Sequence, residues 1–268
     1  MIAGRAPGLL RRIFRANQVV VVIVGFLVVW QVAGTIFKAP PYLLPLPSAI
    51  LAELAARPKI YAINGAYTLY NTLIAFALST VIGVGMAIAI VYSKFLEKTL
   101  YTFLVALNSV PKVALAPIFV LWLGTGDASK IGIAFFIAIF AIVVDAVLGL
   151  RSVDPEMLDL ARTLRGGELK VLLKIRFPNA LPSIFAGMKV AVSLALVGVI
   201  VGEFVVSKQG LGHVILVSQG VFDTTAMFGA IFVLAFLGTV LFYGIELLER
   251  RLLPWHVSHR SQRASTGH

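Results

Sequence analysis

Six long apolar runs, separated by polar or proline-rich segments, make up most of this chain. A helix needs about 20 largely apolar residues to cross the hydrocarbon core of a bilayer, because each residue advances it by about 1.5 Å. The runs that reach or approach this length cover residues 19–37, 67–92, 100–123, 130–150, 184–206 and 226–248. Hydrophobic residues form 59% of the sequence, more than in a typical soluble domain. The pattern predicts an all-α integral membrane protein with six transmembrane helices.

Lysine and arginine are distributed unevenly between the two sides of this predicted bundle. With the N-terminus inside, 16 of the 23 basic residues fall in segments on the cytoplasmic side and only five on the other side. Cytoplasmic loops of membrane proteins carry this excess of positive charge, so both termini are predicted to be cytoplasmic. The net charge of +11 then follows from membrane topology, and we expect no nucleic-acid partner.

Charge and hydropathy divide the sequence into three parts. Residues 1–18 form a basic cytoplasmic segment, residues 19–250 form the transmembrane domain, and residues 251–268 form a polar cytoplasmic tail expected to be disordered. The loop over residues 38–65 is rich in proline, and a short amphipathic helix is expected within it, over residues 50–56. The first apolar run could belong to a signal peptide, but no small-residue cleavage site follows it, so we expect a retained helix.

Several functional groups are missing from the sequence. It has no cysteine, which excludes disulfides and thiolate metal sites. His256 and His259 lie in the polar tail, where we expect solvated side chains rather than metal ligands. We find neither a Gly-Lys-Ser/Thr phosphate loop nor a catalytic constellation. We therefore expect a non-catalytic protein that binds no metal or cofactor; if ATP drives it, another subunit must bind the ATP.

The most polar internal stretch, residues 154–182, separates the fourth and fifth apolar runs and is predicted to form a helical hairpin. Asp154 is a good N-cap and Pro155 suits the first helical position. The apolar residues that follow recur on one helical face: Met157, Leu160, Ala161 and Leu164. Gly166 and Gly167 are expected to end this helix, and Pro178 is expected to end a second short one. The residues alone leave two alternatives, a hairpin lying on anionic lipid and a hairpin docked on a partner.

Ionisable residues within the apolar runs are candidates for function, because charge is costly inside a membrane. Lys112 follows Pro111 in the third run, Asp145 lies in the fourth, and Lys189 and Glu203 lie in the fifth. We consider Lys112, Asp145 and Glu203 as residues of a substrate pathway. The alternative is structural: Lys189 extends to the cytoplasmic interface, Glu203 to the outer one, and Asp145 caps or pairs with a neighbouring helix.

Gly198 and Gly202 form a Gly-x-x-x-Gly motif immediately before Glu203. Small residues at this spacing let two membrane helices approach closely. The fifth run is therefore our candidate for lining a pathway or a subunit interface.

Residues 159–161 read Asp-Leu-Ala, and Ile175 and Phe177-Pro178 follow them. This arrangement resembles the EAA loop of ABC-importer permeases, although Leu160 replaces an alanine and Arg165 stands where that loop has glycine, with Gly166 one place late. In that family the loop inserts into a cleft on the cytoplasmic ATPase subunit. The resemblance implies a coupling element that contains Asp159, Leu160, Ala161, Arg165, Gly166, Ile175, Phe177 and Pro178.

Four further segments, residues 44–50, 109–131, 149–156 and 202–215, resemble the nitrate/sulfonate/taurine branch of the binding-protein-dependent permeases. The resemblance implies a type I ABC importer permease in a bacterial plasma (inner) membrane. It implies a homodimer, ATP and magnesium bound by separate ATPase subunits, and a periplasmic or lipoprotein binding protein that delivers a small solute. Sulfonates, taurine, nitrate and vitamin precursors are the solute types so implied.

Two other functions are consistent with parts of the sequence. A stand-alone ion-coupled secondary transporter could use Asp145 and Glu203 as a relay, but no internal repeat of the kind common in such transporters is visible. A membrane scaffold or enzyme could use the hairpin to bind lipid.

Overall fold

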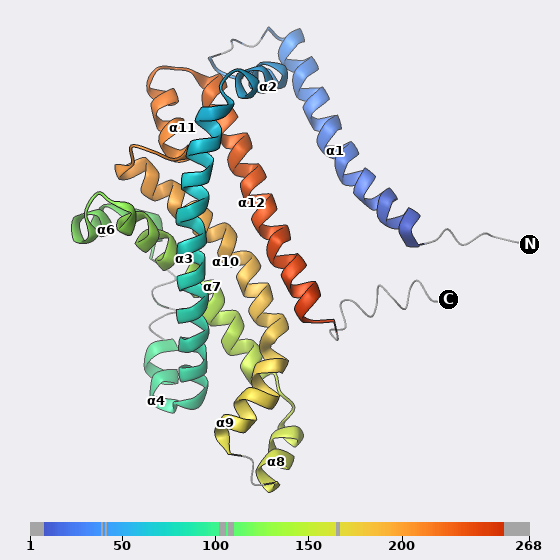
Figure 1. Ribbon diagram of the computed structural model, residues 1–268, viewed down its shortest axis with the longest axis vertical. Helices are drawn as coiled ribbons and strands as arrows, with labels where there is room; N and C mark the ends of the chain where they lie inside the picture. The colour runs from blue at the N-terminus through green and yellow to red at the C-terminus, as the bar shows by residue number, and fades with distance from the viewer. Residues whose placement is uncertain are drawn as a thin grey trace, which may run out of the picture.

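A computed structural model describes residues 8–38, 40, 42–101, 106, 110–164 and 167–254. In these residues all regular secondary structure is helical, which confirms the all-α class (Figure 1). Four helices are long and apolar enough to cross a membrane: α3 (Pro58–Tyr92), α7 (Asp127–Arg151), the continuous helix Glu168–Val206 that ends in α10, and α12 (Thr224–Leu252).

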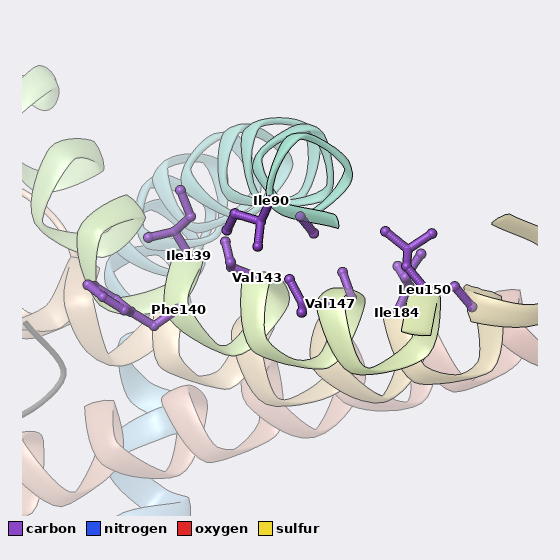
Figure 2. Packing of buried hydrophobic residues seen from close by; sticks show 10 residues of the cluster. Ile90, Ile139, Phe140, Val143, Val147, Leu150 and Ile184 are labelled. Carbon is purple, nitrogen blue, oxygen red and sulfur yellow. The ribbon is translucent and has the colours of Figure 1, made fainter. Parts of the chain in front are cut away.

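The centre of the bundle is α7, which packs against α3 on one side and α10 on the other. Side chains from these three helices interlock in one buried cluster, in which Ile90 of α3 and Ile184 of α10 meet a row of α7 residues (Figure 2). That row consists of Ile139, Phe140, Val143, Val147 and Leu150. Small residues bring the backbones close: Gly83 of α3 lies against Ile142, and Gly149 of α7 lies against Ala180.

The first apolar run forms α1 (Gly8–Ile36), which leans away from the other helices (Figure 1). It meets them near its C-terminal end, where the ring of Trp30 lies edge-on to Phe228 of α12 with centroids 5.8 Å apart. The short helix expected in the proline-rich loop is present as α2 (Pro47–Ala56).

The third apolar run differs from the prediction of one helix over residues 100–123. The described residues form α4 (Lys94–Leu96), a π turn over Glu97–Tyr101, a 3-10 turn over Lys112–Leu115 and α6 (Ala116–Leu123). Pro111 is extended, with ψ 90°, and precedes the 3-10 turn; it has no N–H with which to continue a helix from the residues before it. Eight residues of α6 cover only about 12 Å, which is too short to cross a bilayer.

The expectation that Pro178 ends a short helix is wrong. The chain is helical from Glu168 to Val206, through α9 (Glu168–Val171), a π turn over Leu172–Arg176 and α10 (Phe177–Val206). Pro178 lacks an N–H, and its ring would clash with the carbonyl four residues earlier in a regular α-helix. The wider π turn directly before it relieves this conflict. The second half of the predicted hairpin is thus the first part of a spanning helix.

The bundle has two distinct ends (Figure 1). The α8 end carries α4, α8 (Pro155–Thr163) and α9, whereas the α11 end carries α2 and α11 (Leu211–Gly220).

Candidate docking helix and buried polar sites

The short helix α8 begins where the sequence predicts. The Asp154 carboxylate accepts a 2.9 Å hydrogen bond from the Glu156 amide, which satisfies one of the free N–H groups at the helix start. The helix continues to Thr163. Arg165 and Gly166, the predicted turn, lie outside the described residues.

The apolar face of α8 is open to the surroundings at the α8 end. Met157, Leu160 and Leu164 are 52%, 61% and 74% exposed, and Leu169 and Leu173, at the start of the following helix, are exposed as well. Contiguous exposed apolar residues outside a spanning segment indicate a surface that binds a protein or a membrane. We call these five leucine and methionine residues the α8 surface.

The other predicted coupling residues divide between this surface and the bundle. Asp159 and Ala161 lie on α8, next to Leu160, and Ala161 is half-buried. Ile175 lies in the π turn, while Phe177 and Pro178 begin α10 and are half-buried. Phe177 packs against the buried cluster of α3, α7 and α10.

Polar contacts connect the segment around α8 to the three central helices. Asn179 of α10 donates a 2.9 Å hydrogen bond to the hydroxyl of Ser152, in the connection before α8. Arg176 donates to the carbonyl of Leu150 at 3.2 Å, and its guanidinium lies 5.6 Å from the ring centroid of Tyr92 in α3. Sequence reasoning missed Arg176 and Asn179; their only signal is their position beside the predicted Ile175, Phe177 and Pro178.

Lys189 has a partner that the sequence did not reveal. Its ammonium group pairs with the carboxylate of Glu249 on α12, and both side chains are largely buried. The ion pair joins α10 to α12, in place of the predicted extension of Lys189 to the interface.

Replacing Lys189 with methionine should lower the free energy of unfolding by about 1–3 kcal/mol, because Glu249 would remain buried without its cation. Thermal unfolding in detergent measures this loss. The double variant Lys189→Glu/Glu249→Lys restores the pair with reversed charges and should recover most of the stability. A methionine variant as stable as the parent would show that the pair contributes nothing.

Lys112 contacts α7 from outside, whereas Asp145 belongs to α7 itself. The Lys112 ammonium lies 4.2 Å from the centroid of the Phe140 ring, a cation–π contact. Asp145 is half-buried and faces Gly187 of α10, where an added Cβ would lie 2.9 Å from the Asp145 Cβ.

Gly198 and Gly202 face α7 within the same chain. A Cβ added at Gly198 would lie 2.4 Å from the Ala134 Cα, and one added at Gly202 would lie 2.9 Å from the Lys130 Cα. The two glycines allow the close helix approach that their spacing predicts, and α7 itself covers the face they form.

Glu203, the third ionisable pathway candidate, is completely buried. Its carboxylate accepts hydrogen bonds from the Thr68 hydroxyl of α3 at 2.8 Å and from the Gly212 amide of α11 at 2.7 Å. The Glu203 side chain is therefore enclosed by α3 and α11 and is not exposed at an interface.

A pocket of about 360 Å³ opens at the α11 end, between α2, α3 and α11. Arg57 bridges two carboxylates there, Glu53 at 3.3 Å and Asp223 at 3.8 Å. Tyr61, Lys208 and His213 also line the pocket. Within the described ranges, no three His, Asp or Glu side chains gather as metal ligands would, and His256 and His259 lie outside those ranges.

Three kinds of comparison relate this chain to known proteins. The model of a family described as "Binding-protein-dependent transport system inner membrane component" matches residues 79–254. The formylaminopyrimidine transport permease protein ThiX of Halalkalibacterium halodurans is 31% identical, over 92% of this chain and 98% of the relative. The putative aliphatic sulfonates transport permease protein SsuC of Bacillus subtilis is 30% identical, over 86% of this chain and 84% of the relative.

The fold is similar to that of a solved transporter chain. A structure of the MetNI methionine ABC transporter in an inward facing conformation matches with a TM-score of 0.64 at 16% sequence identity. The match covers 73% of this chain and 98% of the solved chain.

Proposed function

The chain belongs to the family of binding-protein-dependent transport system inner membrane components and is an ABC transporter permease. We propose that it couples ATP hydrolysis in separate subunits to the import of a small solute. The observation that carries this proposal is the α8 surface, an exposed apolar face whose residues Met157, Leu160 and Leu164 lie outside the four long spans. We propose that this surface docks onto an ATPase subunit, which binds ATP and magnesium. We expect the permease itself to bind neither.

The contacts beneath α8 suggest how movement of the ATPase subunits reaches the membrane. Arg176 contacts α3 and α7, and Asn179 holds the connection that precedes α8. A shift of α8 would therefore move the ends of α7 and α10 together. Alternating access needs such a rigid connection, because a packed helix bundle changes between discrete arrangements.

The packing within one chain favours a solute pathway between two copies. Gly198 and Gly202 bring α10 directly against α7, and Gly83 brings α3 directly against α7 as well. This close packing leaves no room for a solute between these helices. We therefore propose a homodimer with the pathway at its interface. Lys112 remains a candidate for a pathway residue, whereas Asp145 packs against Gly187 in the interface of α7 and α10.

The proposed topology places the α8 end and both termini in the cytoplasm of a bacterial cell and the α11 end outside. A periplasmic or lipid-anchored binding protein would then deliver solute at the α11 end. The relatives named for formylaminopyrimidine and aliphatic sulfonates support a small polar solute, either a vitamin precursor or a sulfonate-like anion.

Transport in proteoliposomes tests this function. Vesicles that contain the chain, its ATPase and its binding protein should accumulate solute only when ATP is supplied on the ATPase side. Vesicles that contain the chain alone should not accumulate solute on a proton or sodium gradient. Gradient-driven accumulation by the chain alone would replace the proposal with a secondary transporter.

A further inference from the structure

Side chains from two helices hold the turn that connects α10 to α11, residues 207–210. Glu203 of α10 accepts the Gly212 amide at 2.7 Å, Thr68 of α3 accepts the Leu211 amide at 2.9 Å, and Asn64 of α3 accepts the Gly210 amide at 2.8 Å. Glu203 and Thr68 also bond to each other at 2.8 Å. Three consecutive amides are thus bound by side chains from outside α11.

These amides are the free N–H groups at the start of α11, for which Gly210 is the N-cap. A helix start lacks internal acceptors and carries partial positive charge, so a carboxylate is well placed there. Because Glu203 and Thr68 are fully buried, water cannot replace them as acceptors. The arrangement fixes both the position and the direction of α11.

The backbone of the turn passes directly over the carboxylate. Gly210 has φ 103°, and an added Cβ would lie 2.1 Å from Glu203 Oε1. At Gly212 an added Cβ would lie 2.8 Å from the Glu203 Cβ. Both positions therefore require glycine, and they form one structural unit with Glu203.

The outer side of the same turn borders the pocket at the α11 end. Lys208 and Gln209 are exposed, and Lys208 lines the pocket together with His213 of α11. The pocket is also lined by Arg57, which lies between α2 and α3, and by Tyr61 of α3. The position of this pocket wall thus depends on the buried contacts of Glu203.

We infer that Glu203 is a positioning residue, which holds the 207–210 turn so that Lys208 and Gln209 meet the incoming solute-binding protein at the α11 end. It acts as a hydrogen-bond acceptor beneath the turn and neither contacts solute nor relays ions. The functional half of this inference rests on the proposed function, because it assumes a binding protein at that end. The structural half rests on this chain alone.

Two substitutions of Glu203 distinguish a role as hydrogen-bond acceptor from a role that needs its negative charge. In Glu203→Gln the amide oxygen can accept from Gly212, and the amide NH₂ can donate to the Thr68 hydroxyl. Thr68 can then donate to the Asn64 carbonyl, which lies 3.1 Å away. Glutamine therefore keeps the turn in place, whereas Glu203→Ala leaves the Gly212 amide without its acceptor. Thr68→Val should act like Glu203→Ala, because it removes the acceptor of the Leu211 amide.

Spin labelling tests the structural half in the assembled transporter. The chain has no cysteine, so Gln209→Cys gives one labelling site per permease chain. The label should become more mobile in Glu203→Ala and Thr68→Val and stay unchanged in Glu203→Gln. Glu246→Ala is the matched control, because it removes a carboxylate on α12 that pairs with Arg250. A label that stays immobile in Glu203→Ala would overturn the inference.

Titration with the solute-binding protein tests the functional half. In Glu203→Ala the concentration that half-maximally stimulates ATP hydrolysis should rise about tenfold, a loss of about 1.4 kcal/mol, with the maximal rate at saturation retained. Glu203→Gln should match the parent. Loss of transport in Glu203→Gln with an immobile label would show that the charge is needed and would overturn the inference. If the unaltered complex shows no stimulation at all, the proposed function fails, while the label still decides whether Glu203 holds the turn.

Discussion

Replacing Gly198 with alanine should destabilise the folded chain by about 1–3 kcal/mol, although alanine favours helix more than glycine does. The added methyl group would lie 2.4 Å from the Ala134 Cα, which is backbone and cannot rotate away. Helices α7 and α10 would have to separate along the most closely packed interface of the bundle. Thermal unfolding in detergent and the yield of folded, monodisperse protein measure the effect.

Gly85→Ala is the matched control for this prediction. Gly85 lies in the long helix α3, and an added Cβ there meets nothing within 4 Å. The same chemical change should leave stability unchanged or raise it by up to about 1 kcal/mol through helix propensity. If both variants unfold at the parent's temperature, α7 and α10 do not pack as closely as described.

Replacing Leu160 with glutamate should abolish ATP-driven solute uptake and leave the permease folded. Leu160 is 61% exposed at the centre of the α8 surface, so the fold does not depend on its burial. A carboxylate placed in an apolar interface with the ATPase would be desolvated without a partner, which costs several kcal/mol in binding. Uptake of labelled solute into proteoliposomes that contain the full complex measures the loss.

Arg162→Glu provides the control for charge. Position 162 lies on the same helix, about 200° around its axis from Leu160 and opposite the stripe of Met157, Leu160 and Leu164, so it places a carboxylate outside the proposed contact. Uptake should stay close to that of the parent. If both variants lost uptake equally, the cause would be added negative charge anywhere on α8. If Leu160→Glu kept full uptake, the α8 surface would have no part in the mechanism.

The sequence predicted the features of the fold that local pattern controls. Apolar runs of sufficient length became the spans α3, α7, α10 and α12, and Asp154 caps α8 as expected. The spacing of Gly198 and Gly202 correctly predicted close helix packing. Each of these features depends on neighbouring residues or on one periodicity.

The errors arose where hydropathy and backbone geometry conflict. The run over residues 100–123 is apolar enough to span, but Pro111 is extended and divides it. Pro178 carries a strong signal for a helix end, yet the π turn before it lets the helix continue. Hydropathy contains no information on either outcome.

The polar contacts inside the bundle join residues that are far apart in the sequence. Thr68 and Glu203 are 135 residues apart, and Lys189 meets Glu249 on another helix. The sequence identified Lys189 and Glu203 as costly residues that need partners, but only the packing of α3, α10, α11 and α12 reveals those partners. The sequence alone therefore suggests a pathway role for Glu203, whereas its contacts indicate that it supports the 207–210 turn.

Co-purification with the ATPase tests the central claim most directly. The intact chain, the Leu160→Glu variant and the Arg162→Glu variant are each expressed with the candidate ATPase subunit and purified through a tag on the permease. We predict one ATPase subunit per chain for the intact protein and for Arg162→Glu, and a folded permease without ATPase for Leu160→Glu. ATPase retained by all three would contradict docking through the α8 surface. ATPase absent from the folded intact chain would contradict the proposal that this chain couples ATP hydrolysis to transport.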